Sequence, residues 1–177
     1  MPKSLDGKHD AITDYEITHQ AKYERTSDGG WRLTEVNVTL SIKSASSWVV
    51  TGKEGDQLLK HEQTHYEISA IAARQLEARP TGLSGDKSQK PADGVAAVAR
   101  KVVGERDAMG KTTVRGLLQE VHDRYDEDLT CGTDHGRRKN NQVRWDHRVS
   151  KTIVDKKGTL SGLNSCPPNE SDAVSGE

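Results

Sequence analysis

The chain has 177 residues, which is the size of a single globular domain rather than two. Hydrophobic residues make up only 32% of it and Phe is absent, so the predicted core is small and polar segments surround it. A total of 26 Lys and Arg against 27 Asp and Glu gives a formal net charge of -1, which argues against a protein whose overall charge attracts nucleic acid or an anionic membrane.

Hydropathy gives no sign of a membrane protein. No apolar run approaches the roughly 20 residues that span a bilayer, and the first residues, MPKSLDGKHDAITDYE, lack the apolar stretch of a signal peptide. We therefore expect no membrane partner and a protein that is either cytoplasmic or the mature part of a secreted or periplasmic one. Cys131 and Cys166 fit both settings, as a disulfide in an oxidising compartment or as two free thiols.

The N-terminal third of the chain has the alternating pattern of β-strands. Residues 15–23 alternate between apolar or aromatic and polar side chains, which predicts a strand with one buried face. Asp-Gly-Gly at 28–30 supplies the backbone freedom of a hairpin turn, and a second alternating run follows at 36–42. Because the Trp and Leu just before that run stand in the opposite phase, we expect a bulge near 34–35. A third short strand is predicted at SWVV, residues 47–50.

Helical patterns dominate the rest of the chain. Asp56 is the predicted cap of a helix over 57–77, and Pro80 ends it. The stretch RPTGLSGDKSQKPADG is predicted to be a flexible connector because of its Gly and Pro content. The loop TCGTDHG precedes the last helix. The remaining helices are predicted at 94–103, 112–129 and 139–154.

Together these elements predict an α+β fold in which an N-terminal antiparallel hairpin or small sheet packs on a helical core. We expect one domain over 14–158, between a flexible N-terminus at 1–13 and a C-terminal tail at 159–177 whose composition is that of a disordered end. Of the oligomeric states, a monomer is favoured.

The stretch LLKHEQTHYEISAIAARQLEA, which begins at Leu58, contains the pattern His-Glu-x-x-His. On a helix, His61 and His65 face the same side and can present their imidazoles to one metal ion. Glu62 is rotated by roughly 100° from His61, so its carboxylate can reach a water molecule on that ion. Metallopeptidases use this spacing to combine two ligands with a general base, and it predicts a zinc site here.

Two histidines on one face of a helix can also be core residues that are hydrogen-bonded to backbone groups. Here they share a stripe with apolar residues, and two buried imidazoles one turn apart would each need a separate partner. A shared metal ion satisfies both rings, so we favour the zinc interpretation. The stripe consists of Leu58, His61, His65, Ile68, Ala72 and Leu76.

A catalytic zinc needs a third protein ligand and an open position for water. The extended pattern His-Glu-x-x-His-x-x-Gly-x-x-His is absent, because Ile68 and Ile71 occupy the required Gly and His positions. His135 is favoured because it lies in a glycine-flanked loop, GTDHG, whose backbone freedom lets a side chain approach the ion. The full set of candidates is His135, His122, His147, Glu120 and Asp126.

Two segments, LLKHEQTHYEISAIAAR and YDEDLTCGTDHGRRKNNQVRWD, resemble a bacterial family of unknown function whose members are predicted secreted zinc-dependent proteases. The hairpin before these segments is also in keeping with that family. The matching residues are His61, Glu62, Gln63, His65, Tyr66, Ile68, Ala73 and Arg74 in the first segment, then Tyr125, Asp126, Thr133, His135, Gly136, Gln142, Trp145 and Asp146 in the second.

The resemblance implies a zincin-like metallopeptidase core. In such a core, His61 and His65 would bind zinc and Glu62 would be the general base. His135 would be the third ligand. The chain departs from the family at Ala70, where members often carry Glu, and the loss of a residue that orients a ligand would weaken metal binding by roughly 10–100-fold.

The main hypothesis is a zinc peptidase that hydrolyses a peptide or protein substrate. Zn²⁺ would activate a water molecule, and Glu62 would take its proton and pass it to the leaving amine. Tyr125 or Tyr66 would stabilise the oxyanion. The strand at 36–42 would align an extended substrate by β-addition. The residues expected to brace the loop that carries His135 are Gln142, Trp145 and Asp146.

Two other functions compete with this hypothesis. The histidines could belong to a non-catalytic binding module that zinc stabilises, with Asp126 or Asp134 closing the fourth position. A nucleic-acid-binding domain could instead use a local basic patch, with Trp145 available for stacking on bases. The near-zero net charge argues against the latter, so we expect no nucleic-acid partner. The patch consists of Arg137, Arg138, Lys139, Arg144 and Arg148.

Overall fold

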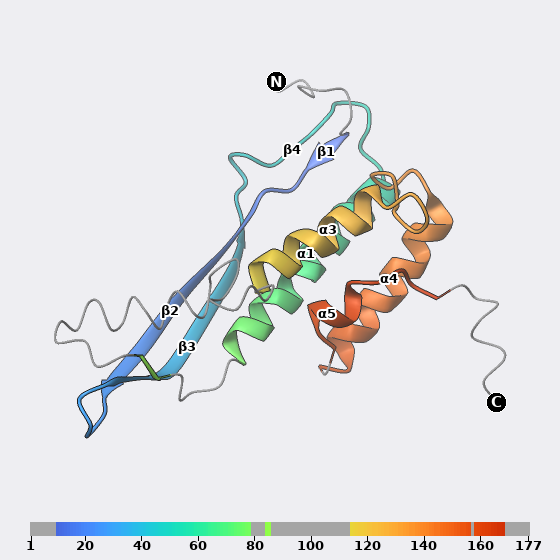
Figure 1. Ribbon diagram of the computed structural model, residues 1–177. Helices are drawn as coiled ribbons and strands as arrows, with labels where there is room; N and C mark the ends of the chain where they lie inside the picture. The colour runs from blue at the N-terminus through green and yellow to red at the C-terminus, as the bar shows by residue number, and fades with distance from the viewer. Residues whose placement is uncertain (1–9, 79–83, 86–113, 157, 169–177) are drawn as a thin grey trace.

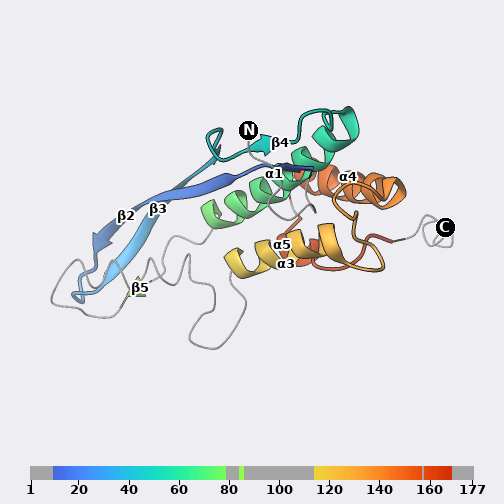
Figure 2. The same ribbon diagram turned by 90° about the horizontal axis from the view of Figure 1, so that it is seen from above.

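A long two-stranded ribbon lies alongside a group of packed helices (Figures 1 and 2). The computed structural model describes residues 10–78, 84–85, 114–156 and 158–168. Over these residues the fold is mixed α+β, with small antiparallel sheets and four helices, as the alternating and helical patterns predict. The longest helix of the described residues, α1 (Asp56–Glu77), contacts the ribbon and three other helices.

The ribbon consists of β2 (Tyr15–Arg25) and β3 (Trp31–Ile42), which pair antiparallel. Gly29 adopts φ +86° in the turn between them, a conformation that glycine reaches without a steric penalty. The register shifts between Lys22 and Tyr23, so that Thr34 is the extra residue of a bulge. The predicted hairpin and the predicted bulge are both confirmed.

Three short strands accompany the ribbon, two that pair with each other and one that pairs with β3. The expected strand at SWVV is present as β4 (Trp48–Val49), and its partner is β1 (Ala11–Ile12). The short β5 (Ser84–Gly85) pairs with the start of β3. The prediction of a flexible N-terminus up to residue 13 is wrong for 11–13, because strand pairing and a hydrogen bond from the Thr13 amide hold this segment.

Helix α1 follows the predicted bounds, but its cap differs. Gly55 is the N-cap, and Asp56 is the first helical residue, where its negative charge complements the helix dipole. The buried face carries a mixture of apolar and polar side chains, and its polar members point toward the site described below. This face consists of His61, Thr64, Ile68, Ser69, Ile71, Ala72 and Leu76.

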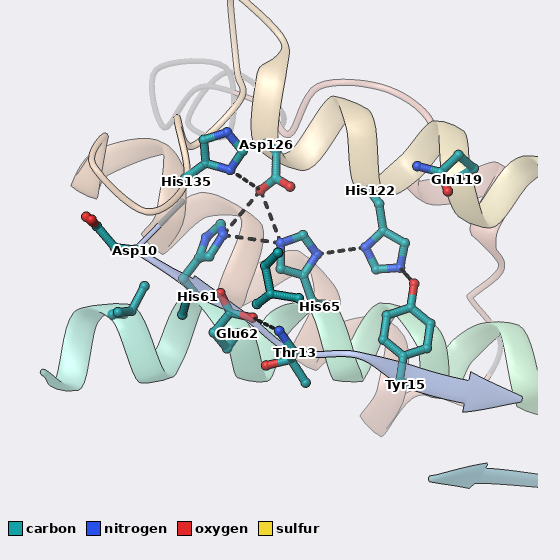
Figure 3. Close-up of a pocket in the computed structure, with 13 residues that line it drawn as sticks. Asp10, Thr13, Tyr15, His61, Glu62, His65, Gln119, His122, Asp126 and His135 are labelled. Carbon is teal, nitrogen blue, oxygen red and sulfur yellow. Dashed lines mark hydrogen bonds and ion pairs between the residues drawn. The ribbon is translucent and has the colours of Figure 1, made fainter. Parts of the chain in front are cut away.

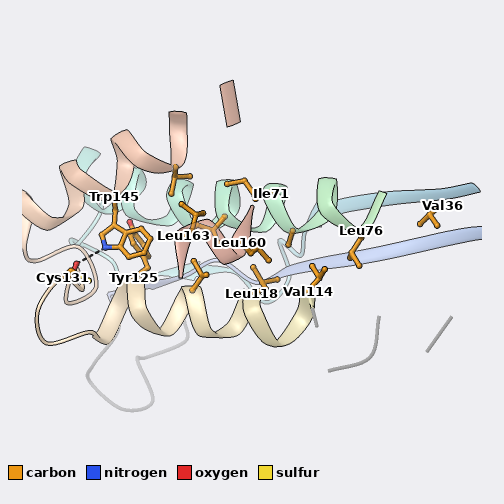
Figure 4. Close-up of a cluster of buried hydrophobic side chains, with 14 of the residues drawn as sticks. Val36, Ile71, Leu76, Val114, Leu118, Tyr125, Cys131, Trp145, Leu160 and Leu163 are labelled. Carbon is orange, nitrogen blue, oxygen red and sulfur yellow. Dashed lines mark hydrogen bonds between the residues drawn. The ribbon is translucent and has the colours of Figure 1, made fainter. Parts of the chain in front are cut away.

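Three other helices complete the described fold: α3 (Val114–Glu127), α4 (Lys139–Val154) and α5 (Leu160–Leu163). Helix α4 has the predicted bounds, whereas the helix predicted at 94–103 lies outside the described residues. Leucines, isoleucines and valines of the four helices and of β3 form one elongated core, with Tyr125 and Trp145 at one end and Val36 at the other (Figure 4). None of the helices in the described ranges combines the length and apolar character that a bilayer-spanning segment requires.

The C-terminal segment is part of the packed fold as far as residue 168. Leu160 and Leu163 are buried on α5, and the Leu160 amide donates to Gln75 Oε1 at 2.8 Å. Cys166 forms a disulfide with Cys131, so of the two alternatives for these cysteines the disulfide is present. The prediction of a disordered tail is therefore wrong for 160–168, because two leucines and a covalent link outweigh the polar composition.

Removal of the disulfide is expected to lower the free energy of unfolding by about 2–4 kcal/mol, because the link closes a loop of 35 residues in the unfolded chain. Urea unfolding of a Cys131→Ser, Cys166→Ser double variant, compared with the parent protein, measures this. A thiol reductant should destabilise the parent protein and leave the double variant unaffected. Equal urea midpoints for the two proteins would contradict the prediction.

Candidate metal centre

Helix α1 brings three polar side chains to one pocket (Figure 3). His61 and His65 are one turn apart, and their Nε2 atoms are 3.2 Å from each other. His61 is almost completely buried, with 2% of its surface exposed, whereas His65 is half-buried. The predicted pair thus converges on one point, as the four-residue spacing on a helix requires.

Asp126, from α3, completes a triangle with the two histidines. Its Oδ1 is 3.2 Å from His61 Nε2 and 3.1 Å from His65 Nε2. All three sides of the triangle are therefore 3.1–3.2 Å long. Asp126 was one of five candidates for a third ligand, and it is the one that lies within hydrogen-bonding distance of both rings.

The outer nitrogen of His61 is held by a chain of polar side chains from α4. Gln142 Oε1 lies 3.1 Å from His61 Nδ1, while the amide nitrogen of Gln142 donates to Asp146 Oδ1. Because a carboxylate only accepts, the orientation of this amide is fixed, and His61 Nδ1 must carry the hydrogen. The other ring nitrogen of His61, Nε2, faces the triangle and lies 3.2 Å from Asp126 Oδ1.

The outer nitrogen of His65 has a second histidine as its partner. His65 Nδ1 is 2.7 Å from His122 Nδ1, and His122 Nε2 is 2.7 Å from Tyr15 Oη. Ser69 Oγ lies 3.3 Å from the same His122 nitrogen. His122, one of the candidate third ligands, is buried behind His65.

Charges in the site reinforce one another. Burial by itself would lower the pKa of His61, but the hydrogen bond and charge of Asp126 outweigh it and raise this pKa. Burial likewise opposes ionisation of Asp126, yet hydrogen bonds and charge from His61 and His65 hold its pKa well below the usual range. For His122, burial and the neighbouring His65 lower the pKa to about 3. Asp126 is therefore a negatively charged carboxylate between His61 and His65, and the His122 ring is neutral.

His135 approaches from the loop between α3 and α4. Asp134, His135 and Gly136 all have positive φ, and this unusual run turns the His135 ring toward the site. His135 Nδ1 is 3.8 Å from Asp126 Oδ1. A Cβ atom at Gly136 would be 3.2 Å from His61 Cβ, so only glycine lets the loop pack this closely on that side chain. Ligand atoms of His61, Asp126 and His135 all lie within 4.8 Å of one another.

Glu62 faces the same pocket, which has a volume of about 190 Å³. One of its carboxylate oxygens, Oε2, accepts a hydrogen bond of 3.0 Å from the Thr13 amide. Residues 10–13 form a wall of the pocket, whereas none of residues 36–42 lines it. The strand at 36–42, which was predicted to align a substrate, packs against α1 but does not reach this pocket.

Tyr125 has a different place from the one predicted. It is completely buried, and its ring stacks on His61 with centroids 4.8 Å apart. Its hydroxyl donates to the His61 carbonyl and accepts from Gln142. This residue does not line the pocket, so the geometry gives it a role in positioning His61 instead of contact with an oxyanion. The alternative, Tyr66, does not line the pocket either.

The remaining candidates lie away from the pocket. Glu120 and His147 are exposed side chains, and Glu120 bonds Asn164. Trp145, expected to be available for base stacking, has no exposed surface and donates from Nε1 to the Cys131 carbonyl at 2.9 Å. Arg138 and Arg148 donate to backbone carbonyls of neighbouring segments. The stacking surface that a nucleic-acid site would need is therefore absent at Trp145.

The sequence pattern did not identify Tyr15 as part of the site, nor did it indicate that His122 and Asp126 both belong to it. His122 and Asp126 are four residues apart on α3, the same spacing as His61 and His65 on α1, and this second pair is the signal that could have found them. Two facing helices each contribute a pair of metal-type side chains. Comparisons of the chain with protein-family models, with curated proteins and with solved structures found no match.

Proposed function

We propose that the protein is a zinc-dependent peptidase whose metal is held by His61, His65 and Asp126. The observation that carries this proposal is the triangle of donor atoms. In a tetrahedral zinc site with bonds of roughly 2.0 Å, neighbouring ligand atoms are roughly 3.3 Å apart. The three separations in this protein are 3.2, 3.2 and 3.1 Å.

The chemistry of the donors also favours zinc over other common ions. Calcium and magnesium prefer a full set of oxygen ligands, whereas two imidazoles and a carboxylate are a usual set for catalytic zinc. His61 and His65 both have their outer nitrogens engaged by other side chains, which is the arrangement that fixes the orientation of metal-bound histidines. The fit therefore extends beyond the three ligand atoms to their supporting partners.

Glu62 would act as the general base in this site. A bound zinc ion would supply a Lewis acid and lower the pKa of a water molecule toward neutrality. The Thr13 amide holds Oε2 of Glu62 at the pocket wall, which keeps the carboxylate beside the donor triangle. From there, Glu62 would accept a proton from the water and return it to the amine that leaves.

The substrate would be an extended peptide that lies along residues 10–13. One edge of this segment faces residues 43–50. There the Asp10 carbonyl accepts from the Val50 amide, the Asp14 carbonyl accepts from the Lys43 amide, and the Asp14 amide donates to Ser47 Oγ. The intervening Thr13 amide points the other way, toward Glu62. Because backbone groups alternate along a strand, this second edge faces the pocket and can pair with a substrate backbone.

Zinc binding and zinc-dependent hydrolysis test the proposal. Protein that has been stripped with a chelator is expected to take up a single zinc ion per chain and to hydrolyse fluorescein-labelled casein only in the reloaded state. Circular dichroism of the stripped protein is the control for loss of fold. No uptake of zinc by folded protein would refute the proposed function.

One observation favours a second candidate, a non-catalytic module that zinc stabilises. His135 is close enough to Asp126 to be considered as a fourth protein ligand, and four protein ligands would close the site to water. Visible spectra of the cobalt-substituted protein separate the two functions. An open site should respond to an added ligand such as acetohydroxamate, whereas a closed site should give an unchanged tetrahedral spectrum.

A further inference from the structure

His122 connects a metal donor to the wall of the pocket (Figure 3). It comes from α3 and is buried, with 7% of its surface exposed, between His65 of α1 and Tyr15 of β2. Both of its ring nitrogens have a partner at 2.7 Å, His65 Nδ1 on one side and Tyr15 Oη on the other. Three rings from three elements thus form a hydrogen-bonded chain.

The hydrogen positions along this chain follow from the role of His65. When His65 Nε2 binds a cation through its lone pair, the ring hydrogen of neutral His65 is on Nδ1. This N–H must donate to His122 Nδ1, which therefore carries a lone pair. A doubly protonated His122 is excluded, because two N–H groups would face each other at 2.7 Å. The hydrogen of His122 is consequently on Nε2 and faces Tyr15.

The acceptor position of Tyr15 determines where its own hydrogen points. Since Tyr15 Oη accepts from His122 Nε2, its hydroxyl hydrogen is directed elsewhere. Ser69 Oγ donates to the His65 carbonyl at 2.9 Å and lies 3.3 Å from His122 Nε2. Because Tyr15 lines the pocket, an oxygen atom of a substrate can accept the hydrogen of the Tyr15 hydroxyl.

We propose that His122 is a positioning residue that sets the hydrogen of His65 and the donor direction of Tyr15, and that Tyr15 donates to the substrate carbonyl oxygen. This inference rests on the proposed function, because it requires a metal at His65 Nε2. Metal-bound histidines usually donate to a carboxylate, a carbonyl or water, and here a second imidazole takes that place. Tyr15 thereby takes over the stabilisation of the oxyanion.

Ring-nitrogen NMR of the zinc-loaded protein tests the hydrogen positions without any need for activity. In protein labelled with ¹⁵N at histidine, two-bond proton–nitrogen spectra should show His65 with its hydrogen on Nδ1 and His122 with its hydrogen on Nε2. A His122→Phe variant assigns the His122 signals. A hydrogen on His122 Nδ1, or on both of its nitrogens, would overturn the inference.

Variants separate positioning from packing. His122→Phe keeps a ring but removes both nitrogens, and it is expected to lower zinc affinity by roughly 10–100-fold. His122→Gln, whose amide can both accept and donate, should restore most of this loss. Tyr15→Phe should retain the parent zinc affinity and lower kcat for casein with little change in KM. The matched control is His147→Phe, at an exposed position of α4, which should change none of these quantities.

The outcomes distinguish this inference from the function on which it rests. Folded parent protein that takes up no zinc refutes both. A zinc-binding parent protein whose His122→Phe and His122→Gln variants lose affinity equally, or not at all, refutes the positioning role alone. Thermal unfolding of each variant identifies any that fails to fold, and in that case the NMR spectra of the parent protein still decide the matter.

Discussion

Glu62→Gln is expected to abolish most of the hydrolytic activity while zinc binding stays at the parent level. Loss of a general base typically lowers the rate by about 10²–10⁴-fold. The variant suits the site because the glutamine oxygen can still accept from the Thr13 amide, as Glu62 Oε2 does at 3.0 Å. The contact between α1 and the pocket wall is therefore retained, and only the ability to take a proton is removed.

The measurements are kcat for casein hydrolysis and the zinc affinity by competition with a chromophoric chelator. Glu67→Gln is the matched control, since Glu67 is on the same helix and bonds Gln63 instead of facing the pocket. It should hydrolyse casein like the parent protein. If Glu62→Gln retains the parent rate at full zinc occupancy, Glu62 is not the base.

Asp126→Asn is expected to weaken zinc binding by at least about 100-fold, because it replaces a charged ligand with a neutral one of the same shape. The same change removes the negative charge that both histidines face at 3.1–3.2 Å. His135→Ala should have a smaller effect on zinc affinity, because His135 Nδ1 is farther from Asp126 Oδ1, at 3.8 Å. Zinc affinities of the two variants, measured side by side, show whether Asp126 or His135 contributes more to zinc binding.

The control for this comparison is Asp123→Asn, on the exposed side of α3 and bonded to Gln119. It should bind zinc like the parent protein. Parent-like affinity in Asp126→Asn, together with a large loss in His135→Ala, would return the third-ligand role to His135. Comparable losses in both would indicate four protein ligands and favour the non-catalytic module.

The local parts of the fold could be predicted because their causes are local. Strand alternation, the turn at Gly29 and the bulge at Thr34 follow from neighbouring residues. The bounds of α4 follow from its apolar spacing. By contrast, α5 has only two leucines within a polar segment, and their burial depends on contacts with distant helices. Composition alone could not show this.

The same division holds at the candidate metal centre. His61, Glu62 and His65 belong to one short motif, so their common direction could be predicted from helix periodicity. The position of Asp126 depends on how α3 packs against α1, and the sequence left it among five candidates. Tyr125 was misplaced for a related reason, because a tyrosine pattern on a helix does not reveal whether the hydroxyl points into a pocket or into the core.

Because the proposed donors are divided between α1 and α3, a bound zinc ion would be linked to the folding equilibrium. His65 and Asp126 are separated by 61 residues in the chain, so an unfolded polypeptide does not hold them together. An ion that binds only the native state shifts the equilibrium toward it, by about 2.7 kcal/mol when its free concentration is 100 times the dissociation constant. A protein with so small an apolar core would thus gain thermal resistance from the supply of metal in its surroundings.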